Sequence, residues 1–310
     1  MKVTVIGAGN VGASTAYGLA QKNIVNEIVL IDVLEGVPQG KALDMYQSAP
    51  VEGYDTRIIG TNNYADTKNS DVIVMTAGKP RKPGMSREDL LSVNIEIVKD
   101  AIGKAAKESP NAFLIVVANP LDAMCYGALK VSGFPSHRVC GMAGILDTAR
   151  FRAFIAMELH MSVRDIDAIV LGGHGDTMVP VTRLTMVGGV PLTSLVSKER
   201  IDAMVTRTQN GGAEIVKLLG TSAWYAPAAA TVETVESYVL DQKRVLPSAA
   251  WLQGQYGVKD LFMGVPVVVG RGGVEKILEI PLNDDEKAMF KASADKVRAT
   301  VEETKVLLNK

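Results

Sequence analysis

The sequence is short of cysteine, of net charge and of long apolar runs, and each shortage excludes a class of protein. Its 310 residues include two cysteines, Cys125 and Cys140, which are too few for a disulfide framework and lack the paired C-x-x-C spacing of a zinc site. The formal charge is -1, so no overall electrostatic bias favours nucleic acid or an anionic membrane surface. We therefore expect no metal site, no nucleic-acid partner, and two small buried thiols in a reducing compartment.

Apolar runs of membrane-spanning length are also missing. No stretch of the sequence approaches the roughly 18 uninterrupted apolar residues that suggest a spanning helix. The apolar start of the chain is soon broken by Gly7 and Gly9, and no signal-peptide cleavage pattern follows it. We expect a soluble, cytoplasmic protein without a membrane partner.

The first half of the chain alternates between strand-like and helix-like segments. The expected strands cover 2–6, 27–31, 71–76, 112–118 and 138–142. The expected helices between them cover 10–22, 36–48, 88–108 and 121–131. Strands that are apolar on both faces and separated by helices are typical of a parallel sheet covered by helices. We predict an α/β fold with a doubly wound parallel sheet over 1–143.

The pattern changes after residue 143, where a second domain is expected over 144–310. The elements expected there are helices at 147–160, 198–219, 227–241 and 284–308, a hairpin around Gly188-Gly189, and strands at 246–252, 265–270 and 273–279. This mixture predicts a C-terminal mixed α/β domain, which would carry the substrate site.

A glycine-rich turn follows the first expected strand and fits G-x-G-x-x-G. The residues of this turn that we expect to bind a cofactor are Gly7, Gly9, Asn10, Val11 and Gly12. The glycines permit the tight turn, the approach of a pyrophosphate and close helix packing, while the helix N-terminus offers free N–H groups to phosphates. Asp32, at the end of the next expected strand, can accept hydrogen bonds from the adenosine ribose and would repel a 2′-phosphate. We predict a Rossmann-type domain that binds NAD rather than NADP.

The chain has only three histidines, and one of them is a candidate for proton transfer. A redox reaction at an alcohol needs a group that exchanges a proton near neutral pH, and histidine suits this best. His137 lies in a polar turn and His160 at the end of an expected helix, so both are interpreted as surface residues. His174 follows the apolar strand 166–171 and is flanked by glycines, so a ligand can approach it. From the residues alone, a catalytic and a structural turn histidine both remain open.

Two further groups of charged residues have alternative interpretations. Asp147 and Arg150 lie three apart on an expected helix and so share a face. They form either a surface ion pair or an aspartate that orients a histidine beside an arginine that grips a carboxylate. Residues 77–87 contain four basic side chains, two prolines and two glycines after a strand. This segment is either a solvated loop or a mobile cationic lid over an anionic substrate.

Together these motifs resemble the lactate/malate dehydrogenase family, in the family's order and over essentially the whole chain. The resemblance implies that His174 is the general acid/base and that Asp147 bonds its other ring nitrogen. It implies that Arg150 binds the C1 carboxylate of the substrate, and that Arg87 polarises the reacting carbonyl. Asn119 is implied to contact both the substrate oxygen and the nicotinamide ribose.

Asn94 is a further cofactor contact implied by the resemblance, and Arg81 is the residue that selects the substrate. Lactate-specific members generally carry a neutral glutamine at the Arg81 position, so the arginine favours malate and oxaloacetate, whose second carboxylate needs a countercharge. The likeness is strongest to malate dehydrogenases that are similar to lactate dehydrogenases, and it implies a homo-oligomer, a tetramer rather than a dimer. The resemblance does not assign a pocket role to either Ser222 or Ala223.

Three other functions compete with this interpretation. One is a lactate or broader 2-hydroxy-acid dehydrogenase, against which Arg81 argues. Another is an NAD-dependent glycosidase on a related fold, which would use a metal held by cysteine and histidine. The third is a non-catalytic NAD-sensing module, which would not need His174, Asp147 and the arginines together.

Overall fold

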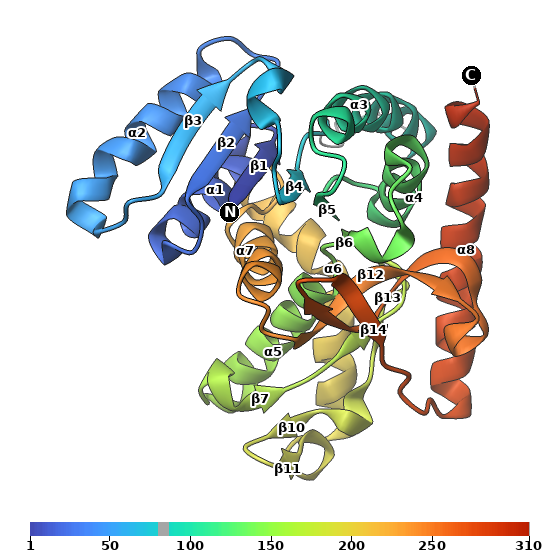
Figure 1. Ribbon diagram of the computed structural model, residues 1–310. Coiled ribbons are helices and arrows are strands. Elements are labelled where there is room, and N and C mark those ends of the chain that lie inside the picture. The colour runs from blue at the N-terminus through green and yellow to red at the C-terminus, as the bar shows by residue number, and fades with distance from the viewer. Residues whose placement is uncertain (80–86, 310) are drawn as a thin grey trace.

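A nine-stranded sheet runs through the molecule in the order β14-β13-β12-β6-β5-β4-β1-β2-β3 (Figure 1). The computed structural model describes residues 1–79 and 87–309, and the side chain of Arg87 is also outside the described part. The strands of this sheet are β1 (Lys2–Ile6), β2 (Glu27–Ile31), β3 (Arg57–Thr61), β4 (Val72–Met75), β5 (Phe113–Val116), β6 (Val139–Gly141), β12 (Arg244–Gln253), β13 (Lys259–Gly270) and β14 (Gly273–Ile277).

Six strands, β1 to β6, pair in parallel, and their order reverses between β1 and β4. Strands β4 and β5 are buried at every position, because helices cover both faces of a parallel sheet and leave no solvated side. In such a sheet ligands bind outside the carboxyl ends of the strands, at the point where the order reverses. The predicted Rossmann-type doubly wound sheet is confirmed.

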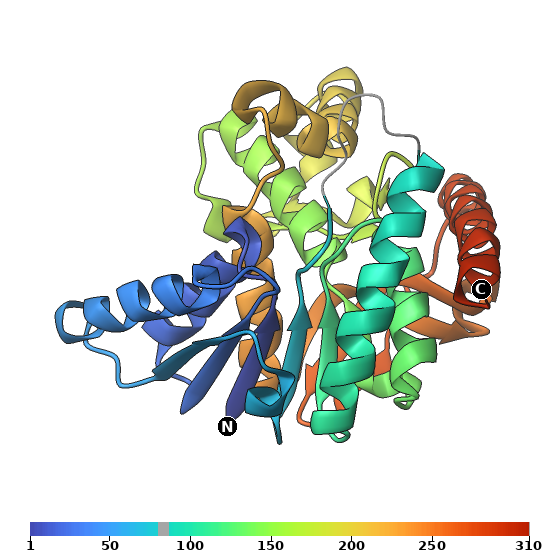
Figure 2. The same ribbon diagram turned by 90° about the horizontal axis from the view of Figure 1, so that it is seen from above.

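Helices pack on both faces of this sheet (Figure 2). The α-helices are α1 (Asn10–Lys22), α2 (Val37–Glu52), α3 (Arg87–Glu108), α4 (Leu121–Ser132), α5 (Gly144–Leu159), α6 (Lys198–Leu219), α7 (Tyr225–Val239) and α8 (Asp284–Leu308). Helix α1 packs against α7, α3 packs against α4, and α8 lies along α4. The bounds of α6 and α8 agree with the helices expected at 198–219 and 284–308.

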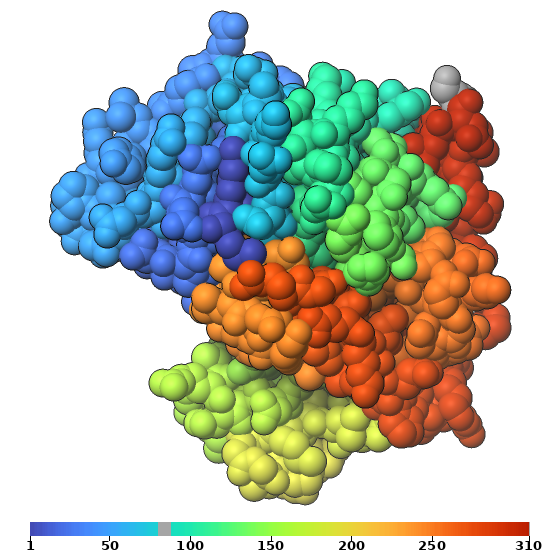
Figure 3. Space-filling model, viewed as in Figure 1, coloured from blue at the N-terminus to red at the C-terminus, as the bar shows by residue number. Residues whose placement is uncertain are grey.

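The second half of the chain extends the sheet and adds a small lobe. Strand β12 pairs antiparallel with β6 through Ala249 and Gly141, and β13 and β14 continue the sheet antiparallel. Two small sheets lie beside it, formed by β7 (Ile166–Asp167), β10 (Met186–Val187) and β11 (Val190–Pro191), and by β8 (Val170–Leu171) and β9 (Val179–Pro180). Figure 3 shows the segments around β10 and β11 projecting from the rest of the molecule.

One hydrophobic core joins the two halves. It extends from the β1 residues Val3 and Val5 to the α8 residues Phe290 and Val301, and a smaller core forms around Phe151 beneath the lobe. Within the described ranges, no helix is long and apolar enough to cross a membrane. The sheet therefore holds the ends of β1, β4 and β5 at one edge, where α5 and the segment after β8 approach them.

Candidate active site

The glycine turn after β1 has the geometry of a phosphate-binding turn. Gly7 has φ +101°, a conformation that favours glycine. A Cβ on Gly12 would lie 1.8 Å from the carbonyl oxygen of Gly7, whereas one on Gly9 would enter open space. Gly9 caps α1 without a side-chain hydrogen bond and no acidic residue occupies the first turn, so the helix offers its N–H groups to an anion.

Asp32 lies beside this turn, at the end of β2. Its Oδ2 accepts a hydrogen bond from the N–H of Ala8 at 2.7 Å, and its Oδ1 accepts one from the N–H of Leu34 at 3.0 Å. The carboxylate is only partly buried, so its remaining lone pairs are open to a ribose diol. The turn, the free helix N-terminus and this carboxylate together fit NAD.

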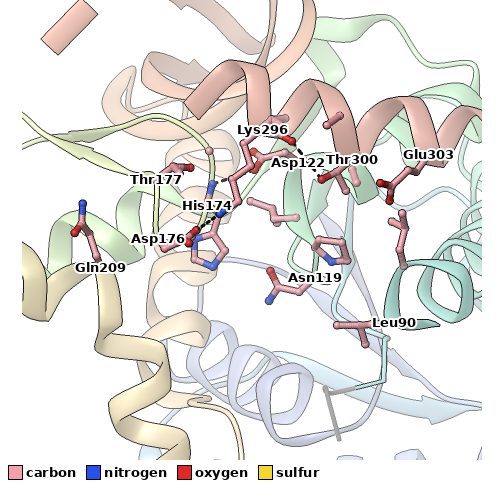
Figure 4. A pocket seen from close by; sticks show the side chains of 18 of the residues that line it. Leu90, Asn119, Asp122, His174, Asp176, Thr177, Gln209, Lys296, Thr300 and Glu303 are labelled. Carbon is pink, nitrogen blue, oxygen red and sulfur yellow. Dashed lines mark hydrogen bonds and ion pairs between the residues drawn. The ribbon is translucent and has the colours of Figure 1, made fainter. Parts of the chain in front are cut away.

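A cavity of about 570 Å³ extends from the glycine turn to His174 and Arg150. A second cavity of about 670 Å³ adjoins it under α8, and His174, Asn119 and Gln209 line both. Figure 4 shows the His174 ring and the Asn119 side chain on facing sides of this second cavity. A cofactor in the first cavity and a small substrate between the two would therefore meet at His174.

His174 and Asp147 form a buried hydrogen-bonded pair. The Nδ1 of His174 lies 2.9 Å from the Oδ2 of Asp147, with the two side chains 17% and 3% exposed. Burial alone would lower the pKa of His174, but the charge and hydrogen bond of Asp147 outweigh it, so the pKa is raised above its ordinary value. Because Nδ1 is occupied, Nε2 is the nitrogen left to exchange a proton with a substrate.

Arg150 completes this cluster from the next turn of α5. Its Nη1 donates to the Oδ1 of Asp147 at 3.3 Å, so Asp147 links the histidine and the arginine. Burial lowers the pKa of Arg150 against the opposing charge of Asp147. Among the described residues, the buried Nε of Arg150 has no hydrogen-bond partner. Arg150 also lines the first cavity, where a guanidinium is suited to bind a ligand carboxylate.

The segment that carries His174 is clamped between α4 and α8. The N–H of His174 donates to Oδ2 of Asp122 at 3.0 Å, and the N–H of Gly173 donates to the Oγ of Ser293 at 2.9 Å. A Cβ on Gly173 would lie 2.4 Å from Cγ2 of Val297, so only glycine allows α8 to approach this closely. Figure 4 shows α8 running past His174 and Asp122.

Asp122 is a second carboxylate near His174. Burial raises its pKa to about 6, although the hydrogen bond from the His174 backbone and the charge of His174 oppose this rise. Its Oδ1 is buried without a partner in the part of the chain that the structure describes. Asp122 therefore fixes the backbone of His174, while Asp147 fixes the ring.

The structure places the other predicted site residues as follows. Asn94 is 1% exposed and bridges two backbones, accepting from the N–H of Lys79 at 2.7 Å and donating to the carbonyl of Asn119 at 2.6 Å. Asn119 is exposed and lines both cavities. Ser222 and Ala223 both line the first cavity. His137 and His160 are exposed, as predicted for surface residues.

Two predicted substrate residues lie outside the described residues, wholly or in their side chain. Arg81 lies in the segment 80–86, which is outside the described residues, and so does the side chain of Arg87, although its backbone begins α3. Among the remaining residues, no group of three or more His, Cys, Asp or Glu side chains could hold a metal ion.

Sequence reasoning missed Asp122 and Ser293. Asp122 follows Asn119-Pro120 at the start of an expected helix. An acidic residue so soon after a segment expected to contact the ligand is the signal that could have identified it. Ser293 lies 120 residues from Gly173, and its place in a charged C-terminal helix gave no signal.

Comparison with known proteins agrees over the whole chain. Residues 1–141 match the lactate/malate dehydrogenase NAD-binding domain, and residues 145–307 match the α/β C-terminal domain of the same family. A malate dehydrogenase of Roseiflexus sp. strain RS-1 is 56% identical over 99% of both chains.

Two solved structures extend this comparison. The malate dehydrogenase of Salinibacter ruber has a TM-score of 0.96 and 52% identity, covering 100% of this chain and 99% of its own. The lactate dehydrogenase of Cryptosporidium parvum, complexed with lactic acid and nicotinamide adenine dinucleotide, has a TM-score of 0.95 and 43% identity, covering 100% and 98%.

Proposed function

The chain belongs to the lactate/malate dehydrogenase family, and from that premise we propose that it is an NAD-dependent oxidoreductase that interconverts (S)-malate and oxaloacetate. The observation that carries the proposal is the chain of contacts His174–Asp147–Arg150 in the wall of the cavity that begins at the glycine turn. It brings a proton carrier and a carboxylate-binding cation together beside a dinucleotide site.

Arg150 and His174 have separate roles in the reaction, carboxylate binding and proton transfer. Arg150 binds the C1 carboxylate and so fixes the carbonyl carbon in the mouth of the cofactor cavity. His174, held protonated by Asp147, donates its Nε2 proton to the carbonyl oxygen during reduction and takes it back during oxidation. NADH, when held by the glycine turn and Asp32, would supply the hydride for this reduction.

The neighbouring polar residues position these groups. Asp122 and Ser293 hold the backbone on either side of the Gly173–His174 peptide bond, which limits the freedom of the proton carrier. Asn119 offers its amide to the substrate oxygen and the nicotinamide ribose, and buried Asn94 fixes the backbone of Asn119. Arg87 polarises the carbonyl in this proposal.

Substrate choice depends on Arg81, which supplies a cation for the second carboxylate of oxaloacetate. Lactate dehydrogenase is the second candidate function, favoured by the likeness to the lactic acid complex from Cryptosporidium parvum. The higher identity to malate dehydrogenases and the arginine at position 81 both support malate instead.

The test is an absorbance assay of NADH consumption with oxaloacetate and with pyruvate. Wild type should use oxaloacetate with a kcat/KM at least about a hundredfold higher than for pyruvate, since pyruvate leaves a cation of the substrate site without a partner. Equal rates with the two substrates would favour the broader 2-hydroxy-acid dehydrogenase. No consumption with either would contradict both candidates.

We also propose a homo-oligomer, a tetramer rather than a dimer, that works in the cytoplasm. Exposed apolar side chains on α2, namely Leu43 at 58% and Tyr46 at 53%, support association because they lie three residues apart on one helix face.

Cys125 and Cys140 are buried free thiols, which fits a reducing compartment. Cell fractionation with immunodetection tests the location. The two domains of the protomer are proposed to be 1–143 for NAD and 144–310 for substrate.

A further inference from the structure

A lysine from α2 and the carboxylate of Asp32 bind the same residue of the glycine turn. The Nζ of Lys41 donates to the carbonyl oxygen of Ala8 at 2.7 Å, and the N–H of Ala8 donates to Oδ2 of Asp32 at 2.7 Å. Both contacts are partly buried. One residue of the turn therefore holds an ammonium on its carbonyl and a carboxylate on its amide.

This arrangement is built by the close packing of α2 on β3. A Cβ on Gly60 would lie 2.1 Å from the carbonyl oxygen of Pro38, so the absent side chain lets the first turn of α2 lie on the strand. Lys41 comes three residues after Pro38 and extends from this turn to Ala8. The position of the ammonium is thus set by backbone packing.

The segment between β2 and α2 is fixed as well. The Nδ2 of Asn62, just after β3, donates to the carbonyl oxygens of Asp32 at 2.8 Å and Leu34 at 3.2 Å. The Oδ1 of the same residue accepts from the Nε2 of Gln39 at 2.5 Å. Asp32 and Lys41 are consequently held at the turn before any ligand binds.

We propose that Lys41 is a positioning residue for the cofactor, which holds the carbonyl of the phosphate-binding turn and places a positive charge near the carboxylate that binds the adenosine ribose. This inference rests on the proposed NAD function and deepens it. With Asp32 present, the carboxylate binds the ribose hydroxyls and rejects a 2′-phosphate, while the ammonium keeps the turn closed.

The same pair contains a latent site for a 2′-phosphate. An ammonium forms charge-assisted hydrogen bonds with phosphate. The ammonium of Lys41 and the ribose-binding carboxylate of Asp32 both contact Ala8. Asp32 masks it by repulsion. Removal of this carboxylate leaves the ammonium of Lys41 at the turn without its competing charge, while exposed Glu35, three residues after Asp32, limits the absolute affinity.

The first experiment measures NADH binding by fluorescence titration without substrate. Lys41→Met should raise the Kd for NADH about tenfold, since the turn loses a charge-assisted hydrogen bond that is partly exposed. Lys41→Arg should keep most of the affinity. Lys68→Met, which removes an exposed lysine of the same domain, is the matched control and should bind as wild type does.

The second experiment compares NADPH binding in two variants that lack Asp32. Asp32→Ser should bind NADPH at least about tenfold more tightly than Asp32→Ser/Lys41→Met, because only the former keeps the phosphate partner. Lys41→Gln in the same background should resemble the methionine variant, since it keeps a donor but no charge. Circular dichroism melts of every variant check that the comparison is between folded proteins.

The outcomes separate this inference from the function on which it rests. If wild type fails to bind NADH, the proposed cofactor is wrong. If wild type binds NADH but the two Asp32→Ser variants bind NADPH with equal Kd values, only the role of Lys41 is overturned. An unchanged NADH affinity in Lys41→Met would likewise overturn its role at the turn.

Discussion

Asp147 contributes most to the raised pKa of His174: its charge and hydrogen bond, with a smaller contribution from Asp122, outweigh the effects of burial and of Arg150. Reduction of oxaloacetate needs the protonated ring, so its kcat/KM should fall as pH rises through the raised pKa. Oxidation of malate needs the neutral ring and should show the opposite dependence. The measurement is the pH profile of kcat/KM in both directions.

Asp147→Asn tests the cause of this shift. Loss of the carboxylate removes the charge that holds the proton, so the inflection should move to lower pH in both directions, with kcat reduced at least about tenfold. His160→Asn, at an exposed histidine, should leave the profile unchanged. An inflection that stays in place in Asp147→Asn would show that another group sets it.

Arg81 and Arg150, which we propose bind different carboxylates of the substrate, should respond differently to substitution. Removing one partner of a buried, hydrogen-bonded charge pair costs about 2–5 kcal/mol, or roughly 30- to several-thousand-fold in kcat/KM. Arg81→Gln should lose oxaloacetate reduction on this scale and raise the relative use of pyruvate. Arg150→Lys should weaken both substrates, because both present a C1 carboxylate. An oxaloacetate-to-pyruvate ratio unchanged by Arg81→Gln would remove Arg81 as the selector.

At the scale of elements, the contact between α8 and the His174 segment is sensitive to a single carbon atom. Gly173→Ala would place a Cβ 2.4 Å from Cγ2 of Val297, which should cost about 1–3 kcal/mol of stability and displace the adjacent His174. The midpoint of thermal unfolding, Tm, and kcat should therefore both be lower than in wild type.

A substitution at Val297 distinguishes a clash with this side chain from an effect of Gly173→Ala on the backbone itself. Val297→Ala removes the opposing methyl groups, so Gly173→Ala/Val297→Ala should recover part of the kcat lost in Gly173→Ala. Val297→Ala alone is the control for its own packing loss. A double variant no more active than Gly173→Ala would assign the effect to the backbone.

The sequence indicated the elements and candidate residues whose signals are local, although the roles of His174, Asp147 and Arg150 came from the family resemblance and stay predictions. The glycine turn with Asp32, the pair Asp147 and Arg150, and His174 between glycines each stand in a short motif that determines its own geometry. Strand β3 was missed because its five residues RIIGT include a glycine, which weakens a strand pattern.

The remaining site residues depend on contacts between distant segments. Lys41 lies 33 residues from Ala8, Asp122 lies 52 from His174, and Ser293 lies 120 from Gly173. Each pair meets only after the sheet has brought α2, α4 or α8 to its edge. No periodicity or motif spacing within one sequence contains that information.

At the scale of the whole molecule, the apolar face of α2 is the surface on which we expect a second copy to pack. Tyr46→Glu should shift the assembly toward smaller species, because a buried unpaired charge opposes association. Light scattering at working concentration measures this. Met289→Glu, at a 46% exposed apolar site on α8, is the control and should keep the native mass; a monomeric wild type would contradict the tetramer.

The pairing of β12 with β6 has a consequence for how the chain is made. Strand β6 ends at Gly141, and its neighbour β12 begins only at Arg244. A nascent chain that has emerged from the ribosome only as far as β6 therefore has an unpaired sheet edge. Such edges are templates for pairing with other chains, and long-range pairing delays folding. We therefore expect the edge of the nucleotide-binding half to stay open to other chains until translation has supplied the strand that closes it.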